Sequence, residues 1–551
     1  MIVEAAAGPG FGAPDFDAIV IGAGVTGMYQ TYLLDEAGLR VLGIEAGADV
    51  GGTWYWNRYP GCRLDTESYA YGYFALKGII PEWRWSETFA GQPEMLRYAN
   101  YAADKMDVRR HYRFNTRVEA ARYDDSNSCW QVTLDSGEIV SCRFLISATG
   151  PLSASRMPDF AGLDSYKGQS FHSSRWPTNP DGSVQDIDFA GKRVGVIGTG
   201  ATGVQIIPIV AQSAQELFVF QRTPNWCTPL GNSPLSDEDM ALIRSRYPTI
   251  LEYVKITDTA FPYHRDTRKG TEVPAEEREA FFEELYDQPG YGIWLSGFRD
   301  LLLSKESNKF LADFVAKKIR QRVKDPAVAE KLIPTDHPFG TKRVPMETNY
   351  YEAYNRDNVH LVDIREAPIQ GFEAGGIRTA DAFYDLDVVI FATGFDAVTG
   401  SLDRIDIRGR NGLRLKDAWS EGPSTYLGVQ ARGFPNFWTL VGPHNGSAFC
   451  NVGVCGGLQA EWVLRMIAYM QARGLTSSEP SERAEQRWTE EVYRDFSRTL
   501  LAEANAWWVK TTERPDGTIE RRTLVHVGGG PEYRKRCEQV AYKNYEGFEM
   551  A

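Results

Sequence analysis

Two glycine-rich fingerprints of the same form constrain the fold of this chain more than any other feature. The first reads Gly22-Ala23-Gly24-Val25-Thr26-Gly27, and the second reads Gly198-Thr199-Gly200-Ala201-Thr202-Gly203. Each follows a short apolar run and opens a segment with a helical pattern. A dinucleotide pyrophosphate needs this order, because glycines permit a tight turn and close backbone approach, and a helix N-terminus then faces the negative charge. The pattern predicts an α/β protein with two Rossmann-like dinucleotide-binding domains.

The residues that follow the next strand distinguish the two sites. Glu45 ends the apolar run 40–44 after the first fingerprint. An acid there accepts hydrogen bonds from ribose hydroxyls and repels a 2′-phosphate. After the second fingerprint, the run 217–220 leads to Arg222, and a guanidinium there can hold a 2′-phosphate through paired hydrogen bonds. We therefore predict FAD at the first site and NADPH at the second.

Length and charge narrow the class of protein. A chain of 551 residues exceeds one compact core, so about two to four domains are expected. The net charge of −13 argues against nucleic acid or an anionic membrane as a partner. No apolar stretch approaches the roughly 18 residues of a membrane span, and residues 1–15 lack the basic and apolar regions of an export signal. A cytoplasmic location is expected.

The cysteines and histidines show no metal-binding or disulfide pattern. The seven histidines are dispersed, without metal-ligand spacing, so no metal site is predicted. No Cys-x-x-Cys pair occurs, and reduced thiols are the simplest interpretation. The seven cysteines are Cys62, Cys129, Cys142, Cys227, Cys450, Cys455 and Cys537.

The chain is expected to cross between the two nucleotide domains twice. Ala148-Thr149-Gly150 and Ala392-Thr393-Gly394 each close an apolar run, and small residues let a backbone pass close to a cofactor. Charged helical patterns fill the region between, which forms either one wall of a substrate cavity or a mere spacer. The predicted parts are residues 1–150 (FAD domain), 151–228 (NADPH domain), 229–336 (helical insertion), 337–396 (NADPH domain) and 397–551 (FAD domain with a C-terminal lid and tail).

A segment between the fingerprints resembles a known family signature. It reads Tyr166-Lys167-Gly168-Gln169-Ser170-Phe171-His172-Ser173-Ser174-Arg175-Trp176-Pro177. This resembles the Baeyer–Villiger monooxygenase signature, Phe-x-Gly-x-x-x-His-x-x-x-Trp followed by proline or aspartate. Tyr166 replaces the usual phenylalanine, whereas Gly168, His172 and Trp176 fit. The resemblance covers nearly the whole chain, including the run 51–61 and Asp65, and the run 338–343.

The resemblance implies a reaction. NADPH reduces the flavin, and dioxygen adds at flavin C4a to give a peroxide. Its ionised form attacks a ketone, and one oxygen atom enters beside the carbonyl to give an ester or lactone. Cyclic or bulky ketones are the expected substrates, with O₂ as the co-substrate. The identity of the ketone stays open, including acyl-CoA and steroid-sized ketones, and a homodimer is one expected state.

The resemblance also implies catalytic roles. It places Arg343 beside the peroxide, where a guanidinium keeps its charge and stabilises developing negative charge. Asp65 matches the acid that orients this arginine. Lys342 matches a lysine that joins Arg222 and Thr223 on the 2′-phosphate of NADPH.

Other positions are assigned by the same resemblance. His172 is expected to be structural, linking cofactor binding to domain position. Trp507 resembles a tryptophan that closes over NADP⁺, although the residues after it depart from the family pattern. The expected flavin neighbours are Thr53, Trp54, Asp65 and Tyr71, with Val118 near the adenosine end. The expected substrate-pocket positions are Ser447, Ala448 and Val452, where a small side chain leaves room for a bulky ketone.

Three other functions share parts of this pattern. A flavin N- or S-oxygenase has both nucleotide sites but needs no arginine beside the flavin to stabilise negative charge. A pyridine-nucleotide disulfide reductase is disfavoured by the missing Cys-x-x-Cys pair. A catalytically silent flavoprotein that senses redox state would bind flavin without consuming NADPH in the presence of a ketone.

Overall fold

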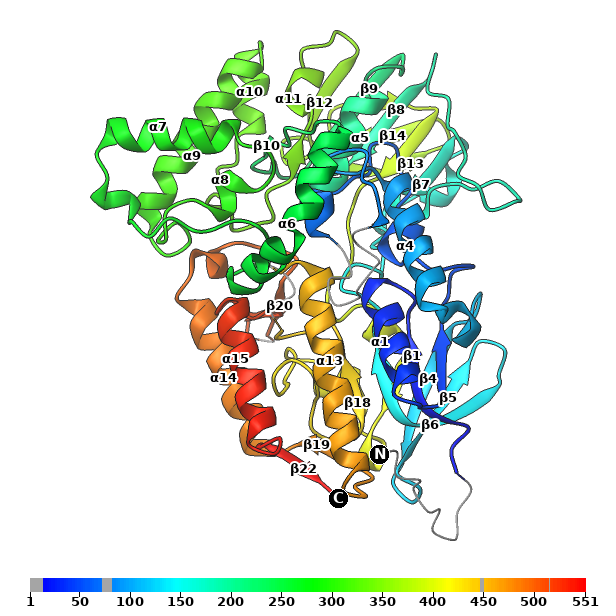
Figure 1. The fold of residues 1–551 in the computed structure, drawn as a ribbon. Helices are drawn as coiled ribbons and strands as arrows, with labels where there is room; N and C mark the ends of the chain where they lie inside the picture. The colour runs from blue at the N-terminus through cyan, green and yellow to red at the C-terminus, as the bar shows by residue number, and fades with distance from the viewer. Residues whose placement is uncertain (1–12, 72–81, 446–449, 515) are drawn as a thin grey trace.

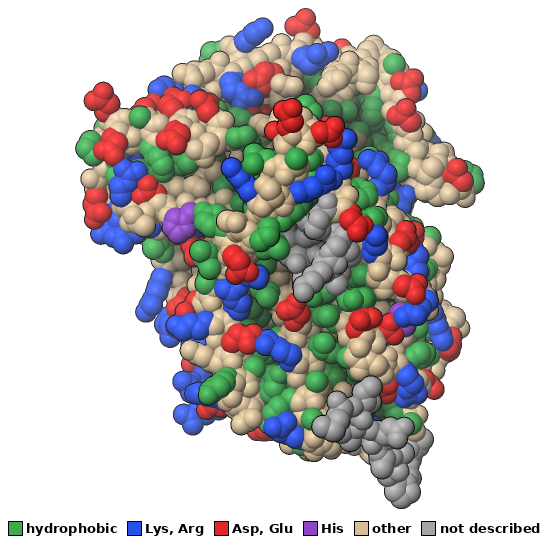
Figure 2. All heavy atoms as spheres, viewed as in Figure 1, with side chains coloured by type: hydrophobic (Ala, Val, Ile, Leu, Met, Phe, Trp, Pro, Cys, Tyr) green, Lys and Arg blue, Asp and Glu red, His purple; other side chains and the backbone are tan. Residues whose placement is uncertain are grey.

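The computed structural model describes residues 13–71, 82–445, 450–514 and 516–551. Two α/β lobes lie one above the other in Figure 1, and each is built on its own sheet. On the face drawn in Figure 2, acidic and basic side chains are interspersed. Among the described residues, no helix is both long enough and apolar enough to cross a membrane.

The lower sheet contains eight strands and the first fingerprint. Its order is β17-β4-β5-β6-β1-β2-β3, with β18 also paired to β6. The central strands β6, β1 and β2 run parallel, and β1 and β2 are mostly buried because parallel strands are covered on both faces. The bounds are β1 (Phe16–Ile21), β2 (Val41–Ile44), β3 (Tyr112–Arg113), β4 (Val118–Asp124), β5 (Cys129–Leu134), β6 (Ile139–Ser147), β17 (Asp406–Arg408) and β18 (Phe437–Thr439).

Two helices from opposite ends of the chain pack together beside this sheet. They are α1 (Val25–Glu36), which follows the first fingerprint, and α13 (Val452–Gln471). Figure 1 shows them side by side. The close contact requires Gly456, because a Cβ there would collide with the side chain of Thr26. The C-terminal half of the chain thereby supports the first nucleotide-binding helix.

The upper sheet contains the second fingerprint and five parallel strands. Its order is β12-β9-β8-β16-β7. The helix α5 (Ala201–Val210) follows β8, and a three-stranded antiparallel sheet, β13-β14-β15, accompanies it. The bounds are β7 (Gln169–His172), β8 (Arg193–Ile197), β9 (Glu216–Gln221), β12 (Val359–Asp363), β13 (Ile369–Glu373), β14 (Gly376–Thr379), β15 (Phe383–Asp385) and β16 (Val388–Phe391).

The two connections between the lobes lie side by side. Gly150 and Gly394, which end the small-residue turns, adopt positive φ angles of 76° and 79°. Beyond the turns, the N–H of Asp396 donates to the carbonyl of Ala154 over 2.8 Å, and Ser155 forms a β-bridge with Phe395. The small-residue turns therefore stand where the chain passes between sheets. The exact domain boundaries stay a prediction.

Helices dominate the segment predicted as an insertion. The helix α6 begins at a capping box between Ser236 and Asp239, which satisfies backbone N–H groups at its start. The charged helical patterns expected at residues 276–286 and 308–323 fall on α7 and α9. The bounds are α6 (Asp237–Ile256), α7 (Ala275–Asp287), α8 (Gly292–Leu295), α9 (Lys305–Arg322) and α10 (Pro326–Leu332).

The prediction that all cysteines are reduced is wrong for one pair. Cys450 and Cys455 form a disulfide with a Cα–Cα distance of 6.3 Å. Cys450 precedes Asn451, the N-cap of α13, and Cys455 lies in its first turn, so the start of the helix brings the two together. The other cysteines are free and buried.

Candidate functional site

The first fingerprint forms a turn that only glycine fits. Gly22 has a φ of 108°, and a Cβ there would lie 2.6 Å from the carbonyl oxygen of Ala148. A Cβ on Gly27 would collide with the carbonyl of Gly22. Gly24 is the N-cap of α1, and a Cβ on Gly52 would lie only 2.6 Å from the Cα of Gly24. Two glycine backbones thus meet at a helix N-terminus, as close approach to a pyrophosphate requires.

Glu45 supports this turn from the end of β2. The carboxylate is buried, and each of its oxygens accepts one backbone N–H, from Ala23 and from Gly47, both over 2.7 Å. A carboxylate oxygen has two lone pairs, so each can still accept a ribose hydroxyl. The carbonyl of Glu45 accepts the N–H of Thr116 over 3.0 Å, two residues before Val118 opens β4.

The second fingerprint repeats the same turn against β16. Gly198 has a φ of 110°, and a Cβ on it would lie 2.5 Å from the carbonyl oxygen of Ala392. A Cβ on Gly203 would collide with the carbonyl of Gly198. Gly200 is the N-cap of α5, and Thr202 lies in the first turn of that helix. The hydroxyl of Thr199 donates to the carbonyl of Thr223 over 2.9 Å, which ties the turn to the end of β9.

Two cations share the region beyond β9. Burial lowers the pKa of Lys342, and the positive charge of Arg222 lowers it further, whereas Asp336, 3.5 Å from the Lys342 amine, opposes this shift. An anion bound between two cations lowers their mutual repulsion. The binding of the NADPH 2′-phosphate by this pair stays a prediction.

A buried acid and an arginine meet where three parts of the chain converge. The Nη2 atom of Arg343 lies 2.5 Å from Oδ2 of Asp65. The hydroxyl of Tyr291, from the N-cap of α8, donates to the same oxygen over 3.1 Å and accepts from Nε of Arg343 over 3.3 Å. The side chain of Gln205, from α5, donates to Oδ1 of Asp65 over 3.2 Å. Asp65 thus receives partners from the helical insertion and from the second fingerprint helix.

The electrostatics keep the guanidinium charged. Burial works against the charge of Arg343, yet the neighbouring Tyr291 and Asp65 raise the pKa of Arg343 above its ordinary value. Burial also raises the pKa of Asp65, and the guanidinium opposes that shift. The Arg343 side chain is 37% exposed and that of Asp65 only 2%, so the arginine alone presents free donors to a ligand.

Comparisons with known proteins identify the family. The flavin-binding monooxygenase-like family model matches residues 17–254. The 2-oxo-Δ³-4,5,5-trimethylcyclopentenylacetyl-CoA monooxygenase of Pseudomonas putida is 80% identical over 98% of this chain and 99% of that protein. A Baeyer–Villiger monooxygenase of Pseudooceanicola batsensis is 42% identical over 90% of this chain and 89% of that protein. This chain belongs to the Baeyer–Villiger monooxygenase family.

A solved structure extends the likeness to three dimensions. The crystal structure of OTEMO in complex with FAD and NADP is 79% identical, covers 98% of this chain and 100% of that one, and superposes with a TM-score of 0.96. The predicted resemblance and the predicted architecture of two dinucleotide-binding domains are therefore confirmed.

In this monooxygenase the signature segment joins the upper sheet to the connection between lobes. Nδ1 of His172 accepts the N–H of Ser174 over 3.1 Å, and Nε2 donates to the carbonyl of Gly394 over 3.1 Å. Burial lowers the pKa of His172 to about 4, so the ring is neutral. A Cβ on Gly168 would collide with the hydroxyl of Tyr166, which donates to the carbonyl of Leu386 between β15 and β16. These contacts give the histidine a structural position.

The predicted flavin neighbours lie around the short helix α2 (Thr53–Trp56). The indole N–H of Trp54 donates to the hydroxyl of Tyr71 over 3.4 Å, and their rings meet edge to face at 6.0 Å. Thr53 is exposed at the start of α2, directly after Gly52. The helix α2 therefore begins directly after Gly52, the residue that meets Gly24 of the first fingerprint.

The remaining predicted positions are the tryptophan expected over NADP⁺ and the three positions expected in the substrate pocket, and the structure describes two of these four. Trp507 packs edge-on against the buried Trp508 at 5.1 Å and is only partly buried itself. Val452 is the first residue of α13 and is half-buried. Ser447 and Ala448 lie outside the described residues.

Arg343 was predicted as a partner of Asp65, but its other two partners, Tyr291 and Gln205, were not. Tyr291 and Gln205 carry no motif, and their spacing to Asp65 is long. Tyr59 lies in the run 51–61, and its hydroxyl donates to the Gln205 side chain over 2.8 Å. Of these three residues, only Tyr59 lies in a run that the family resemblance had singled out.

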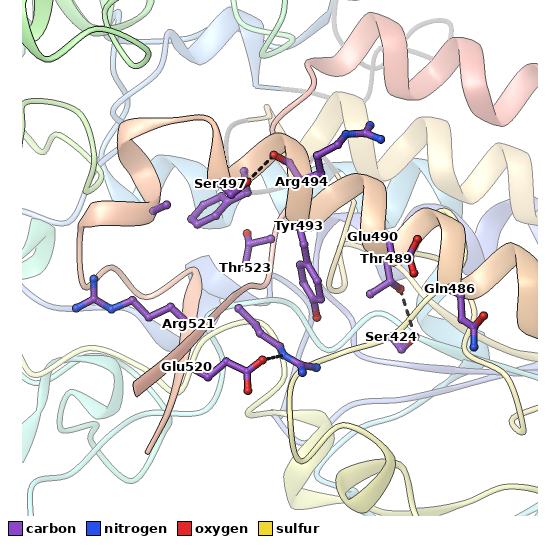
Figure 3. A pocket seen from close by; sticks show the side chains of 13 residues that line it. Ser424, Gln486, Thr489, Glu490, Tyr493, Arg494, Ser497, Glu520, Arg521 and Thr523 are labelled. Atoms are coloured by element: carbon purple, nitrogen blue, oxygen red, sulfur yellow. Dashed lines mark hydrogen bonds and ion pairs between the residues drawn. The ribbon is translucent and has the colours of Figure 1, made fainter. Parts of the chain in front are cut away.

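A separate hollow lies elsewhere on the lower lobe. It has a volume of about 530 Å³ and lies between α14 (Glu482–Ser497) and β21 (Ile519–Thr523). Figure 3 shows Tyr493 on α14 and Glu520 and Arg521 on β21 around it. None of the predicted site residues lines it. The glycine turns and the Arg343–Asp65 pair, rather than this hollow, carry the chemistry expected of a flavin enzyme.

Proposed function

We propose that this monooxygenase uses NADPH, O₂ and bound FAD to insert one oxygen atom beside the carbonyl of a cyclic or bulky ketone, giving an ester or lactone. The observation that carries this is the fixed cation Arg343, held by Asp65 and Tyr291 at the junction of three parts of the chain. Oxygen insertion at a carbonyl passes through an anionic adduct, and a permanent positive charge in a partly dry site stabilises such an anion.

The cofactor sites support the same proposal. The first turn, with Glu45 behind it, fits the pyrophosphate and ribose of FAD, and the second, with Arg222 and Lys342, fits NADPH. When bound, the reduced flavin supplies electrons to O₂, so that one of the two oxygen atoms of O₂ can be transferred to the ketone. The chain contributes the cation and a fixed orientation of it, through the carboxylate of Asp65.

We propose a ketone carried on a coenzyme A thioester as the substrate class. The support is the name of the 80% identical relative from Pseudomonas putida, which acts on a cyclopentenylacetyl-CoA. The small Val452 at the start of α13 is proposed to leave room for the substituted ring. A higher kcat/KM for the CoA thioester than for the free acid is expected. Equal values would overturn this substrate class without affecting the reaction type.

We further propose that the protein works in the cytoplasm and forms a homodimer. The −13 net charge suits a protein that stays dispersed rather than bound to anionic surfaces. A molar mass by light scattering of one chain rather than two would overturn the dimer.

Isotope labelling tests the reaction. The purified holoenzyme is given NADPH, a cyclic ketone and ¹⁸O₂, and the product is weighed by mass spectrometry. One ¹⁸O atom in a lactone is the expected result. The alternative is an N- or S-oxygenase, and product only from amines or thioethers, with no lactone from any ketone, would favour it.

A further inference from the structure

A buried acid close to the catalytic pair has no role in the reaction described so far. Glu67 lies two residues after Asp65 and is 7% exposed. One oxygen accepts the hydroxyl of Tyr263, and the other accepts weakly from Thr66 over 3.4 Å. Among the residues that the structure describes, no lysine or arginine forms an ion pair with Glu67. Burial raises the pKa of Glu67, and the hydrogen bond from Tyr263 opposes that shift. Burying an acid without a cation is costly, so its contacts with neighbouring hydroxyls are its main compensation.

The partner of Glu67 comes from the helical insertion. Tyr263 follows α6, and its hydroxyl, besides donating to Glu67, accepts the backbone N–H of Tyr291 over 3.0 Å. Gly290 makes this approach possible, because a Cβ there would collide with that hydroxyl and its φ is 75°. One hydroxyl therefore connects an acid of the lower lobe to the backbone of Tyr291.

Tyr291 is also held at its other end. Its side-chain hydroxyl contacts Asp65 over 3.1 Å and Arg343 over 3.3 Å. The insertion is thus attached to the short segment 65–67 at two points, through Tyr291 to Asp65 and through Tyr263 to Glu67. The bond between Tyr263 and Tyr291 joins the two attachments into one closed loop of contacts.

We propose that Glu67 and Tyr263 are a positioning pair that fixes Tyr291, and through it the orientation of the Arg343 guanidinium. The inference rests on the proposed catalytic role of Arg343. A single attachment permits Tyr291 to rotate about the bond to Asp65, whereas two attachments fix its direction. Misplacement of a catalytic group by about 1 Å can cost on the order of a hundredfold in rate. Neither Glu67 nor Tyr263 is proposed to touch substrate.

Four variants of the holoenzyme test the pair. Tyr263→Phe removes the central hydroxyl, and Glu67→Leu removes its acceptor. Glu67→Gln is the conservative variant, because an amide oxygen still accepts the Tyr263 hydroxyl. Tyr286→Phe is the matched control, since it removes another hydroxyl of the insertion. That hydroxyl accepts a hydrogen bond of 3.2 Å from Arg322 and does not contact Asp65.

The expected result separates positioning from folding. Tyr263→Phe and Glu67→Leu are expected to lower kcat for lactone formation about tenfold or more, with FAD content and the KM for NADPH unchanged. Thioether oxidation, which does not need the cation, is expected to fall much less. Glu67→Gln should restore most of the rate. A double variant that combines Tyr263→Phe with Glu67→Leu should be no slower than either single variant, because both substitutions break the same loop of contacts.

Hydrogen–deuterium exchange supplies a readout that needs no turnover. The amide of Tyr291 donates to Tyr263, so Tyr263→Phe and Glu67→Leu should speed its exchange, whereas Glu67→Gln and Tyr286→Phe should not. The proposal is overturned if Tyr263→Phe behaves like the control, if lactone formation and thioether oxidation fall together, or if Glu67→Gln is as slow as Glu67→Leu. Absence of lactone from the unaltered enzyme would instead overturn the proposed function.

Discussion

The guanidinium of Arg343 and the carboxylate of Asp65 lie 2.5 Å apart although the two residues are 278 positions apart in the sequence. The two side chains are unequally covered, with 37% of the arginine exposed and 2% of the aspartate. A covered carboxylate cannot reach a ligand, but a guanidinium has five N–H donors and uses few of them on Asp65 and Tyr291. The pair thus directs a fixed charge outward from a buried anchor.

Loss of that charge should separate two reactions of the same flavin. Arg343→Ala is expected to lower lactone formation by about a hundredfold or more, the range seen when one stabilising donor is removed from an anionic transition state. Thioether oxidation, a reaction at a soft nucleophile, should persist. Product yields per NADPH consumed measure both. Arg498→Ala is the control, because that side chain is 70% exposed. Parallel loss of both reactions in Arg343→Ala would contradict the assigned role.

Cofactor choice should depend on the cations beyond β9. Arg222→Ala and Lys342→Ala are each expected to raise the KM for NADPH by about tenfold or more, because a charge-assisted hydrogen bond contributes about 1.5–3 kcal/mol. The KM for NADH should change little, since NADH lacks the 2′-phosphate. Steady-state kinetics with both coenzymes test this, with Arg365→Ala as a control whose guanidinium is paired with Asp363. An equal rise for both coenzymes would exclude this phosphate site.

Glu45 should govern flavin retention. Glu45→Leu leaves the N–H groups of Ala23 and Gly47 without their acceptor, and each unmet buried donor costs about 1–3 kcal/mol. The variant is expected to lose FAD on gel filtration and to melt at a lower temperature. Glu45→Gln, which keeps an acceptor oxygen, should retain more FAD. If Glu45→Leu holds FAD as firmly as the unaltered protein, the acid does not support the FAD site.

The sequence was informative where backbone geometry restricts residue type. Gly22 and Gly198 were predictable because a positive φ beside a neighbouring carbonyl admits only glycine, and the strands before them were predictable from apolar runs. Tyr263, Tyr291 and Gln205 were not, because no local pattern marks them and only tertiary folding brings them to Asp65 and Glu67. The Cys450–Cys455 pairing was hidden for a similar reason, since it depends on α13 beginning between the two.

Acid should destabilise the fold partly through His172. In the folded protein burial lowers the pKa of this ring to about 4, whereas an unfolded histidine has a pKa of about 6.5. Between these values the unfolded chain binds the extra proton, so the free energy of unfolding falls as the pH drops from about 6.5 to 4, by up to about 1.4 kcal/mol per pH unit for one group. Above pH 6.5 this group has no effect.

Denaturant unfolding at several pH values between about 4 and 6.5 measures this effect. A plot of the free energy of unfolding against pH should have a shallower slope for His172→Asn than for the unaltered protein. His264→Asn, which removes an exposed ring, is the control for loss of a histidine elsewhere in the chain. Identical slopes for the two variants would mean that His172 is protonated in the folded protein. The assignment of a neutral ring that joins the signature segment to Gly394 would then be wrong.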